Sequence, residues 1–215
     1  MTLQVGLAGL AVATLAALRS TWSPWGESML TSIHPLGQRA RGHRWGPAVA
    51  LFTAASVLGG LSTGALVGAL GTIYDVPVWV AAIGCVLAAL ADGLRPRTYG
   101  HRQVDEDWLT RYRSWVYVTG FGWQLGAGVL TIVTSASTWA WLLVLLVLGL
   151  PGALAAGAAF GLVRALPVLA GRSAQTPEAL RSLARRLESG RVWADRVTVL
   201  GLLIIAAALT TGVFG

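Results

Sequence analysis

The sequence predicts an all-α, polytopic membrane protein: six transmembrane helices in a 3+3 inverted repeat, with both termini outside the cytoplasm. The first observation is composition, because 55% of the 215 residues are hydrophobic and only 12% are charged. A soluble domain carries roughly 25% charged residues. The second is the set of long uncharged stretches, several of which reach the roughly 18 residues that a membrane span requires. The third is the distribution of arginine along the chain.

Six apolar segments follow one another along a single predicted membrane domain, 1–215. We place the spans at 3–18, 46–73, 77–94, 114–134, 138–163 and 197–214. The first lacks a basic start and a small-residue cleavage site, so it is predicted to be a span rather than a signal peptide. The fifth carries Pro151 in its middle, and the connection before it reads TSAST.

All sixteen positive charges are arginines, and they lie in alternate connections, within 19–44, 95–113 and 164–196. Positive charge collects in cytoplasmic loops, so these three connections are predicted to face the cytoplasm. This orientation accounts for the net charge of +7, and we expect no nucleic-acid partner. Cys85 is the single cysteine, so no internal disulfide can form.

Aromatic residues flank the two predicted outer turns. Tyr74 and Trp79 lie beside the first turn, and Trp139 and Trp141 lie beside the second. Tryptophan and tyrosine favour the membrane–water interface. We therefore expect these four side chains to belong to an aromatic belt.

A basic amphipathic helix is predicted at about 176–190, with Thr176 as its cap and Gly190 as its end. One face carries leucines among arginines, namely Leu180, Leu183 and Leu187 with Arg181 and Arg185. Such a helix lies on a membrane surface. Docking to a cytoplasmic protein partner is the alternative.

Two predicted spans carry glycines at four-residue spacing. They are Gly60, Gly64 and Gly68 in the second span and Gly157 and Gly161 in the fifth. Small residues at this spacing let helices approach closely. We predict tight packing, with a sliding surface in a transporter as the alternative.

The stretch WSPWGESMLTSIHPLG, residues 22–37, interrupts the first apolar segment. Pro24 disfavours a continuous helix, and an ionised Glu27 or Arg19 inside a membrane would face an interior or a cavity. One interpretation is a broken helix within the membrane. The other is that the span ends at Leu18 and an ordinary loop follows. A 16-residue span is short for a bilayer, which favours the broken helix.

The second half of the chain has a similar layout, which predicts repeats at about 1–95 and 112–215. Its first span is rich in glycine and has Gln124 as its one strongly polar residue. Interrupted helices at matching positions of inverted repeats indicate a site near the membrane midplane. The candidate cavity residues are Pro24, Trp25, Glu27, Trp123, Gln124 and Gly126.

Two short motifs resemble the CcdA/DsbD-type membrane thiol-disulfide transporters, within the superfamily of LysE-type exporters. SPW at 23–25 resembles the family's SPC-x-x-P, and GWQLGAGVL at 122–130 resembles its GWTPCxGPxL. The resemblance implies six helices in the inverted arrangement. Trp25 and Gly126 stand where the family has its two redox cysteines, and one thiol cannot cycle an intramolecular disulfide. Thiol-disulfide activity is therefore not expected.

Two functions remain open on the sequence alone. The first is a transporter or exporter of an unidentified small solute, with Glu27 coupling transport to protons. The second is a non-transporting membrane subunit or assembly factor that binds a partner through its Arg-rich cytoplasmic face. We expect no enzymatic activity, no cofactor and no metal, since His34, His43 and His101 all fall in Arg-rich loops. The expected partners are the lipid bilayer, a small solute, and a cytoplasmic or membrane protein.

Overall fold

The computed structural model describes residues 3–23, 26, 29–30, 32–94, 113–131, 133–173 and 175–214. Within these residues every regular element is a helix, which confirms the all-α class. The elements are α1 (Leu3–Arg19), η1 (Ser20–Trp22), α3 (Pro35–Ala40), α4 (Trp45–Tyr74), α5 (Val78–Leu94), α7 (Ser114–Ala127), α8 (Ser137–Val147), α9 (Gly149–Ala165), η2 (Leu166–Ser173) and α10 (Pro177–Phe214).

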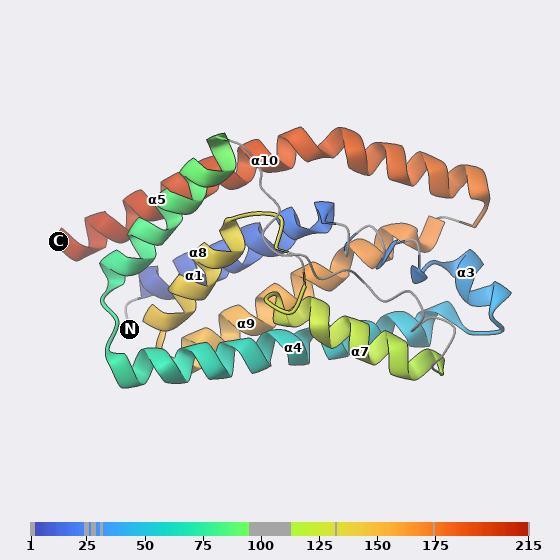
Figure 1. The fold of residues 1–215 in the computed structure, drawn as a ribbon, viewed down its shortest axis with the longest axis horizontal. Coiled ribbons are helices and arrows are strands. Elements are labelled where there is room, and N and C mark those ends of the chain that lie inside the picture. Colours follow the sequence, from blue (N-terminus) through green and yellow to red (C-terminus); the bar gives the residue numbers. More distant parts are fainter. Residues whose placement is uncertain are drawn as a thin grey trace.

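The helices form an elongated bundle in which α1 and α9 run one way and α4 and α10 run the other (Figure 1). The start of α1 and the end of α10 lie at the same end of this bundle. Four helical stretches are long and apolar enough to cross a membrane: Leu3–Trp22, Trp45–Tyr74, Gly149–Ser173 and Pro177–Thr211. The described part of the chain is therefore compatible with a membrane protein.

Helix α4 packs against α9 at glycines, where the backbones of the two helices touch. A Cβ at Gly60 would overlap the Gly157 carbonyl, and one at Gly64 would overlap the Ala153 carbonyl. One turn away, the Ser56 hydroxyl donates to the Gly161 carbonyl at 2.8 Å. The two helices run antiparallel in direct backbone contact, and larger residues at these positions would hold them apart.

The predicted bounds of the fourth and fifth spans are wrong. Helix α7 ends at Ala127, and α8 begins at Ser137 and continues in the same direction along α4 (Figure 1). The chain reverses only at Gly149, whose φ is +63°. The fifth predicted span is therefore two helices, and Pro151 stands in the first turn of α9, where proline is tolerated.

The TSAST segment is consequently not an outer turn. Ser135, Ser137 and Thr138 are buried inside the bundle. Trp141, expected in an aromatic belt, is fully buried and stacks on Phe160 with ring centroids 3.8 Å apart. Its neighbour Trp139 is about half exposed.

Helix α10 does not end at Gly190, as the sequence predicted. It is one bowed helix from Pro177 to Phe214 (Figure 1), and the Thr176 hydroxyl accepts from the Ala179 N–H at 3.2 Å at its start. The glycine faces η1 instead, since a Cβ there would stand 3.3 Å from Cζ2 of Trp22. The small residue therefore makes room for an aromatic side chain from a distant segment.

We expect Gly60→Ala to lower the thermal unfolding midpoint of the detergent-solubilised protein, because its methyl group would push α4 away from α9. Overpacking of this kind typically costs about 1–3 kcal/mol. Circular dichroism during heating measures the change. The matched control is Gly93→Ala in α5, where the new methyl would meet Val199 Cγ1 at an ordinary 3.9 Å. Equal midpoints for Gly60→Ala and the unaltered protein would contradict the direct α4–α9 backbone contact.

Candidate functional site

Polar groups inside the apolar bundle gather at the break between α7 and α8. The carboxylate of Asp92, near the end of α5, lies on one side of this break and accepts hydrogen bonds from it. Its Oδ1 accepts from the Ala136 N–H at 2.8 Å, and its Oδ2 accepts from the Ser135 hydroxyl at 2.5 Å and from the Ser137 N–H at 3.3 Å. Asp92 thus caps α8 from another helix, where the helix dipole favours a negative charge.

Arg164 lies on the other side of the break. The sequence placed it in a cytoplasmic connection, but the structure places it in α9 with 3% of its surface exposed. Its Nη2 donates to the Thr131 hydroxyl at 3.2 Å, and its guanidinium lies 5.6 Å from the Phe160 ring centroid. Phe160 in turn stacks on Trp141, so an arginine and two aromatic rings form a column beside the break.

Gly128 allows the chain to turn at this point. Its φ is +74°, and a Cβ there would meet the rings of Trp141 and Phe160 at about 3 Å. A side chain at this position would therefore have both strained backbone and no space. The break is a tightly built joint whose charged groups, Asp92 and Arg164, each bond to the loop that joins the two helices.

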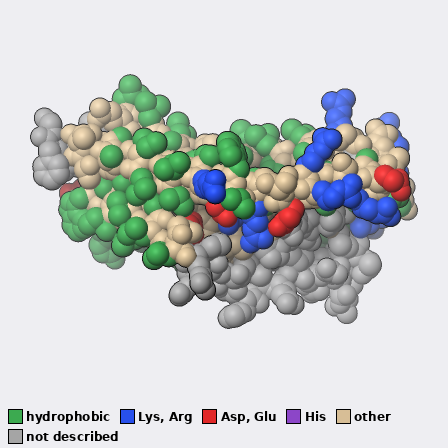
Figure 2. All heavy atoms as spheres, turned by 90° about the horizontal axis from the view of Figure 1, so that it is seen from above, with side chains coloured by type: hydrophobic (Ala, Val, Ile, Leu, Met, Phe, Trp, Pro, Cys, Tyr) green, Lys and Arg blue, Asp and Glu red, His purple; other side chains and the backbone are tan. Residues whose placement is uncertain are grey.

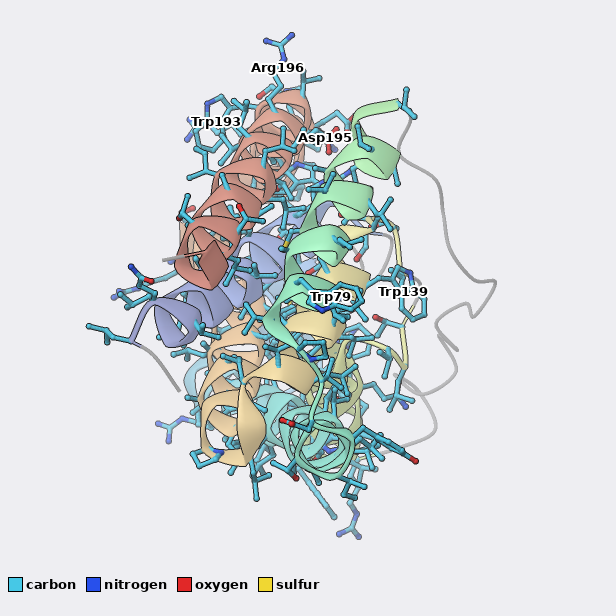
Figure 3. The ribbon with its side chains drawn as sticks, turned by 90° about the vertical axis from the view of Figure 1, so that its left-hand side faces the viewer. Trp79, Trp139, Trp193, Asp195 and Arg196 are labelled. Carbon is cyan, nitrogen blue, oxygen red and sulfur yellow. The ribbon has the colours of Figure 1, made fainter. Side chains whose placement is uncertain are left out.

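A second group of buried polar contacts joins the end of α1 to the middle of α10. Arg19 is 2% exposed and its Nε forms an ion pair with Asp195. Asp195 turns toward the neighbouring helices, whereas Trp193 and Arg196 beside it point away from the bundle (Figure 3). Just beyond Arg19, Trp22 Nε1 donates to the Leu187 carbonyl at 2.7 Å. Arg19 is therefore a buried link between helices rather than an exposed anchor.

The described residues of the 22–37 interruption are packed, not exposed as in an ordinary loop. Ser23, Met29 and Ile33 are buried. Gln38 follows in α3 and is also buried, with Nε2 donating to the Ser32 carbonyl at 3.1 Å and to the Tyr117 hydroxyl at 2.9 Å. The segment is thereby fixed to α7. Three predicted cavity residues, Pro24, Trp25 and Glu27, lie outside the described residues, as does His101.

The three predicted cavity residues on α7 differ in burial and in their neighbours. Trp123 is 40% exposed, and its Nε1 donates to the Ser62 hydroxyl at 3.3 Å. Gly126 packs on the Ser56 carbonyl of α4, and Gln124 between them is partly exposed. Gly126 therefore belongs to a helix contact, while Trp123 lies at the bundle surface.

The first half of α10 borders a groove of about 430 Å³. Its lining includes Leu180, Leu183 and Leu187 together with Leu30 from the interruption, and Arg185 and Glu188 also line it. Arg181 is exposed, with its nearest carboxylate in Glu178 at 3.8 Å. Arginine side chains gather around this end of the molecule, while hydrophobic side chains cover the opposite end (Figure 2).

Sequence reasoning missed Asp92, Arg164 and Asp195 as functional candidates. A signal existed for Arg164, because the residues after it, ALPVLAG, remain apolar and could have extended the span. No comparable local signal marks Asp92, whose partners lie more than 40 positions away.

We expect Asp92→Asn to destabilise the protein, because an amide replaces one of the two carboxylate oxygens that accept hydrogen bonds from the start of α8. Loss of such a cap or buried acceptor costs about 1–3 kcal/mol. Denaturant unfolding in detergent measures the change. The control is Asp75→Asn, since Asp75 is exposed and has a left-handed backbone (φ +44°) that asparagine tolerates. Equal effects of the two substitutions would contradict the capping role.

We expect Arg19→Met alone to cost about 1–3 kcal/mol, since it leaves the Asp195 carboxylate, which is 28% exposed, without its partner beside an apolar bundle. The double variant Arg19→Met/Asp195→Leu should recover most of this loss, because no unpaired charge remains. The same unfolding measurement closes the double-mutant cycle. The exposed Arg191–Glu188 pair is the comparison, and its coupling should stay below about 1 kcal/mol. Additive effects at positions 19 and 195 would mean that the ion pair contributes no coupling.

Comparison with known proteins finds similarity to the methylamine utilization protein MauF from three bacteria. The chain is 29% identical to that of Methylophilus methylotrophus over 97% of its own length and 76% of the relative. It is 33% identical to that of Paracoccus versutus (62% and 51%) and 32% identical to that of Paracoccus denitrificans (74% and 61%). No family model matches the chain, and no solved structure matches it.

These similarities overturn the resemblance to CcdA/DsbD-type transporters and to LysE-type exporters. That resemblance rested on two short motifs, whereas the similarity to MauF of Methylophilus methylotrophus extends over 97% of the chain. Both motifs are short, and closely spaced glycines are common where membrane helices pack together, so the motifs had little specificity. The prediction of a solute transporter is wrong for the same reason, and none of these relatives supports a transported solute. The non-transporting subunit or assembly factor agrees better with the relatives.

Proposed function

We propose that the protein belongs with the MauF proteins and serves methylamine utilization as a membrane-embedded subunit or assembly factor, without transport or catalysis of its own. The observation that carries this proposal is the similarity to MauF over 97% of the chain. The relatives are methylamine utilization proteins, and we extend this role to the present chain.

In this proposal the helices cross the membrane six times, with both termini outside. Helices α7 and α8 are two halves of one crossing, and α1, α4, α5, α9 and α10 make the others. Their alternating directions in Figure 1 support the assignment. So does the gathering of arginines at one end, because positive charge favours the cytoplasmic side.

The buried charged groups support a scaffolding role for this protein. Asp92 accepts three hydrogen bonds from the start of α8 and the two residues before it, and Arg19 is paired with Asp195. Groups engaged in this way hold neighbouring helices in one arrangement, because breaking a buried pair leaves an unpaired charge that is costly in an apolar interior. Such a body is suited to presenting a fixed surface to another protein.

The partner surface in this proposal is the groove between Leu30 and the first half of α10. Its leucines on α10 are partly buried, and the exposed Arg181, Arg185 and Arg186 lie on the same helix. The three arginines outnumber Glu178 and Glu188 around the groove, so its apolar lining and net positive charge are complementary to an amphipathic helix that carries acidic residues. The proposed partner is therefore a protein with such a helix at the cytoplasmic surface.

The test is deletion of the gene in its own host, followed by growth with methylamine and with a substrate that needs no methylamine oxidation. We expect growth on methylamine to be lost and growth on the other substrate to be unchanged. Uptake of isotope-labelled methylamine should also be unchanged. Loss of uptake would restore transport as the function, and undisturbed growth on methylamine would contradict a role in its utilization.

Complementation of the deletion tests the groove. We expect Leu183→Gln to restore growth on methylamine poorly, at a protein level equal to that of the unaltered chain, because it places an amide in the apolar groove. Ser189→Gln lies on the exposed surface of the same helix and should restore growth fully. Equal growth with both variants would remove the groove from the proposal.

A further inference from the structure

A pocket of about 560 Å³ lies between the starts of α4 and α7. It is separate from the groove on α10 and from the break between α7 and α8. Volumes of roughly 300–1,000 Å³ are typical of sites that hold a small organic molecule. Its lining has a basic part and an apolar part, and the two together indicate which kind of ligand would bind there.

The basic part consists of Arg44 and Arg113, with His43 beside them. Arg44 immediately precedes α4 and Arg113 immediately precedes α7, and both are exposed. Within the described residues neither arginine has an ion-pair partner, and neither helix has an acidic residue in its first turn. Two arginines at one pocket favour an anion, and the guanidinium groups of arginine bind phosphate through paired hydrogen bonds.

The apolar part begins one turn into the two helices. Ala48 and Leu51 of α4 face the pocket together with Val118 of α7. Trp115 also lines it and is 60% exposed, as tryptophans at a membrane–water interface are. A free phosphate ion would gain nothing from this wall. A molecule with a phosphate at one end and a hydrocarbon chain at the other would use both parts.

We propose that this pocket binds one anionic phospholipid, with its phosphate between Arg44 and Arg113 and the start of one acyl chain against Leu51 and Val118. The site lies at the arginine-rich end of the bundle, where the anionic lipids of a cytoplasmic leaflet are available. Binding of this lipid does not depend on the proposed role in methylamine utilization, and the two can fail independently.

The experiment reconstitutes the full chain into phosphatidylcholine vesicles that contain a small fraction of lipid brominated on its acyl chains. The brominated lipid is phosphatidylglycerol in one series and phosphatidylcholine in the other. We expect greater quenching of tryptophan fluorescence by the brominated phosphatidylglycerol. The excess should disappear in Trp115→Phe. Equal quenching by the two lipids in the unaltered protein would overturn the proposal, and this comparison needs no variant to fold.

A matched pair of double variants separates the pocket from general surface charge. Arg44→Gln/Arg113→Gln should reduce the excess quenching severalfold, and Arg181→Gln/Arg185→Gln, which removes the same charge from α10, should leave it intact. Equal reduction by both pairs would overturn the proposal in favour of diffuse attraction. Loss of the excess on addition of inorganic phosphate would also overturn it, because the site would then take a free anion.

Discussion

The close approach of α4 to its neighbours is the constraint on which the rest of the structure depends. Gly60 and Gly64 face α9, Gly59 faces α7, and Gly71 meets the end of α8. Helices in a membrane gain nothing from leaving water, so their association relies on contact between closely fitted surfaces. One glycine-rich helix therefore sets the positions of three others, and each contact leaves no room for a methyl group.

The break between α7 and α8 leaves backbone polar groups inside the bundle, where they need hydrogen-bond partners. Gly128 turns the chain against Trp141 and Phe160, and α8 then starts inside the bundle with unsatisfied N–H groups. Asp92 satisfies those groups from α5, and Arg164 bonds to Thr131 from α9. The joint thus ties four helices together, which explains why polar residues occur so deep in an apolar bundle.

The sequence predicted what depends on local pattern and failed where a distant residue decides. Long apolar runs indicate α4, most of α1 and the second half of α10, and the pair Thr176–Pro177 marks the start of α10. TSAST has the composition of a solvent-facing turn, and Asp92, more than 40 positions away, accepts hydrogen bonds that make its burial favourable. The chain reversal at Gly149 lies inside an unbroken apolar run, so hydropathy cannot locate it. Gly190 looked like a helix end because its contact with Trp22 is invisible in the local sequence.

The shape of α10 links this fold to the proposed role. Its centre is held by the Arg19–Asp195 pair and by the hydrogen bond from Trp22 to the Leu187 carbonyl. Its second half packs along α5 and α1, whereas its first half borders the groove near Leu30 and carries exposed arginines. A helix that only completed a transmembrane bundle would need no such extension, because roughly 20 residues cross a bilayer. The additional turns, held firmly at one point and basic on their exposed side, are the part of the molecule best placed to engage an acidic partner.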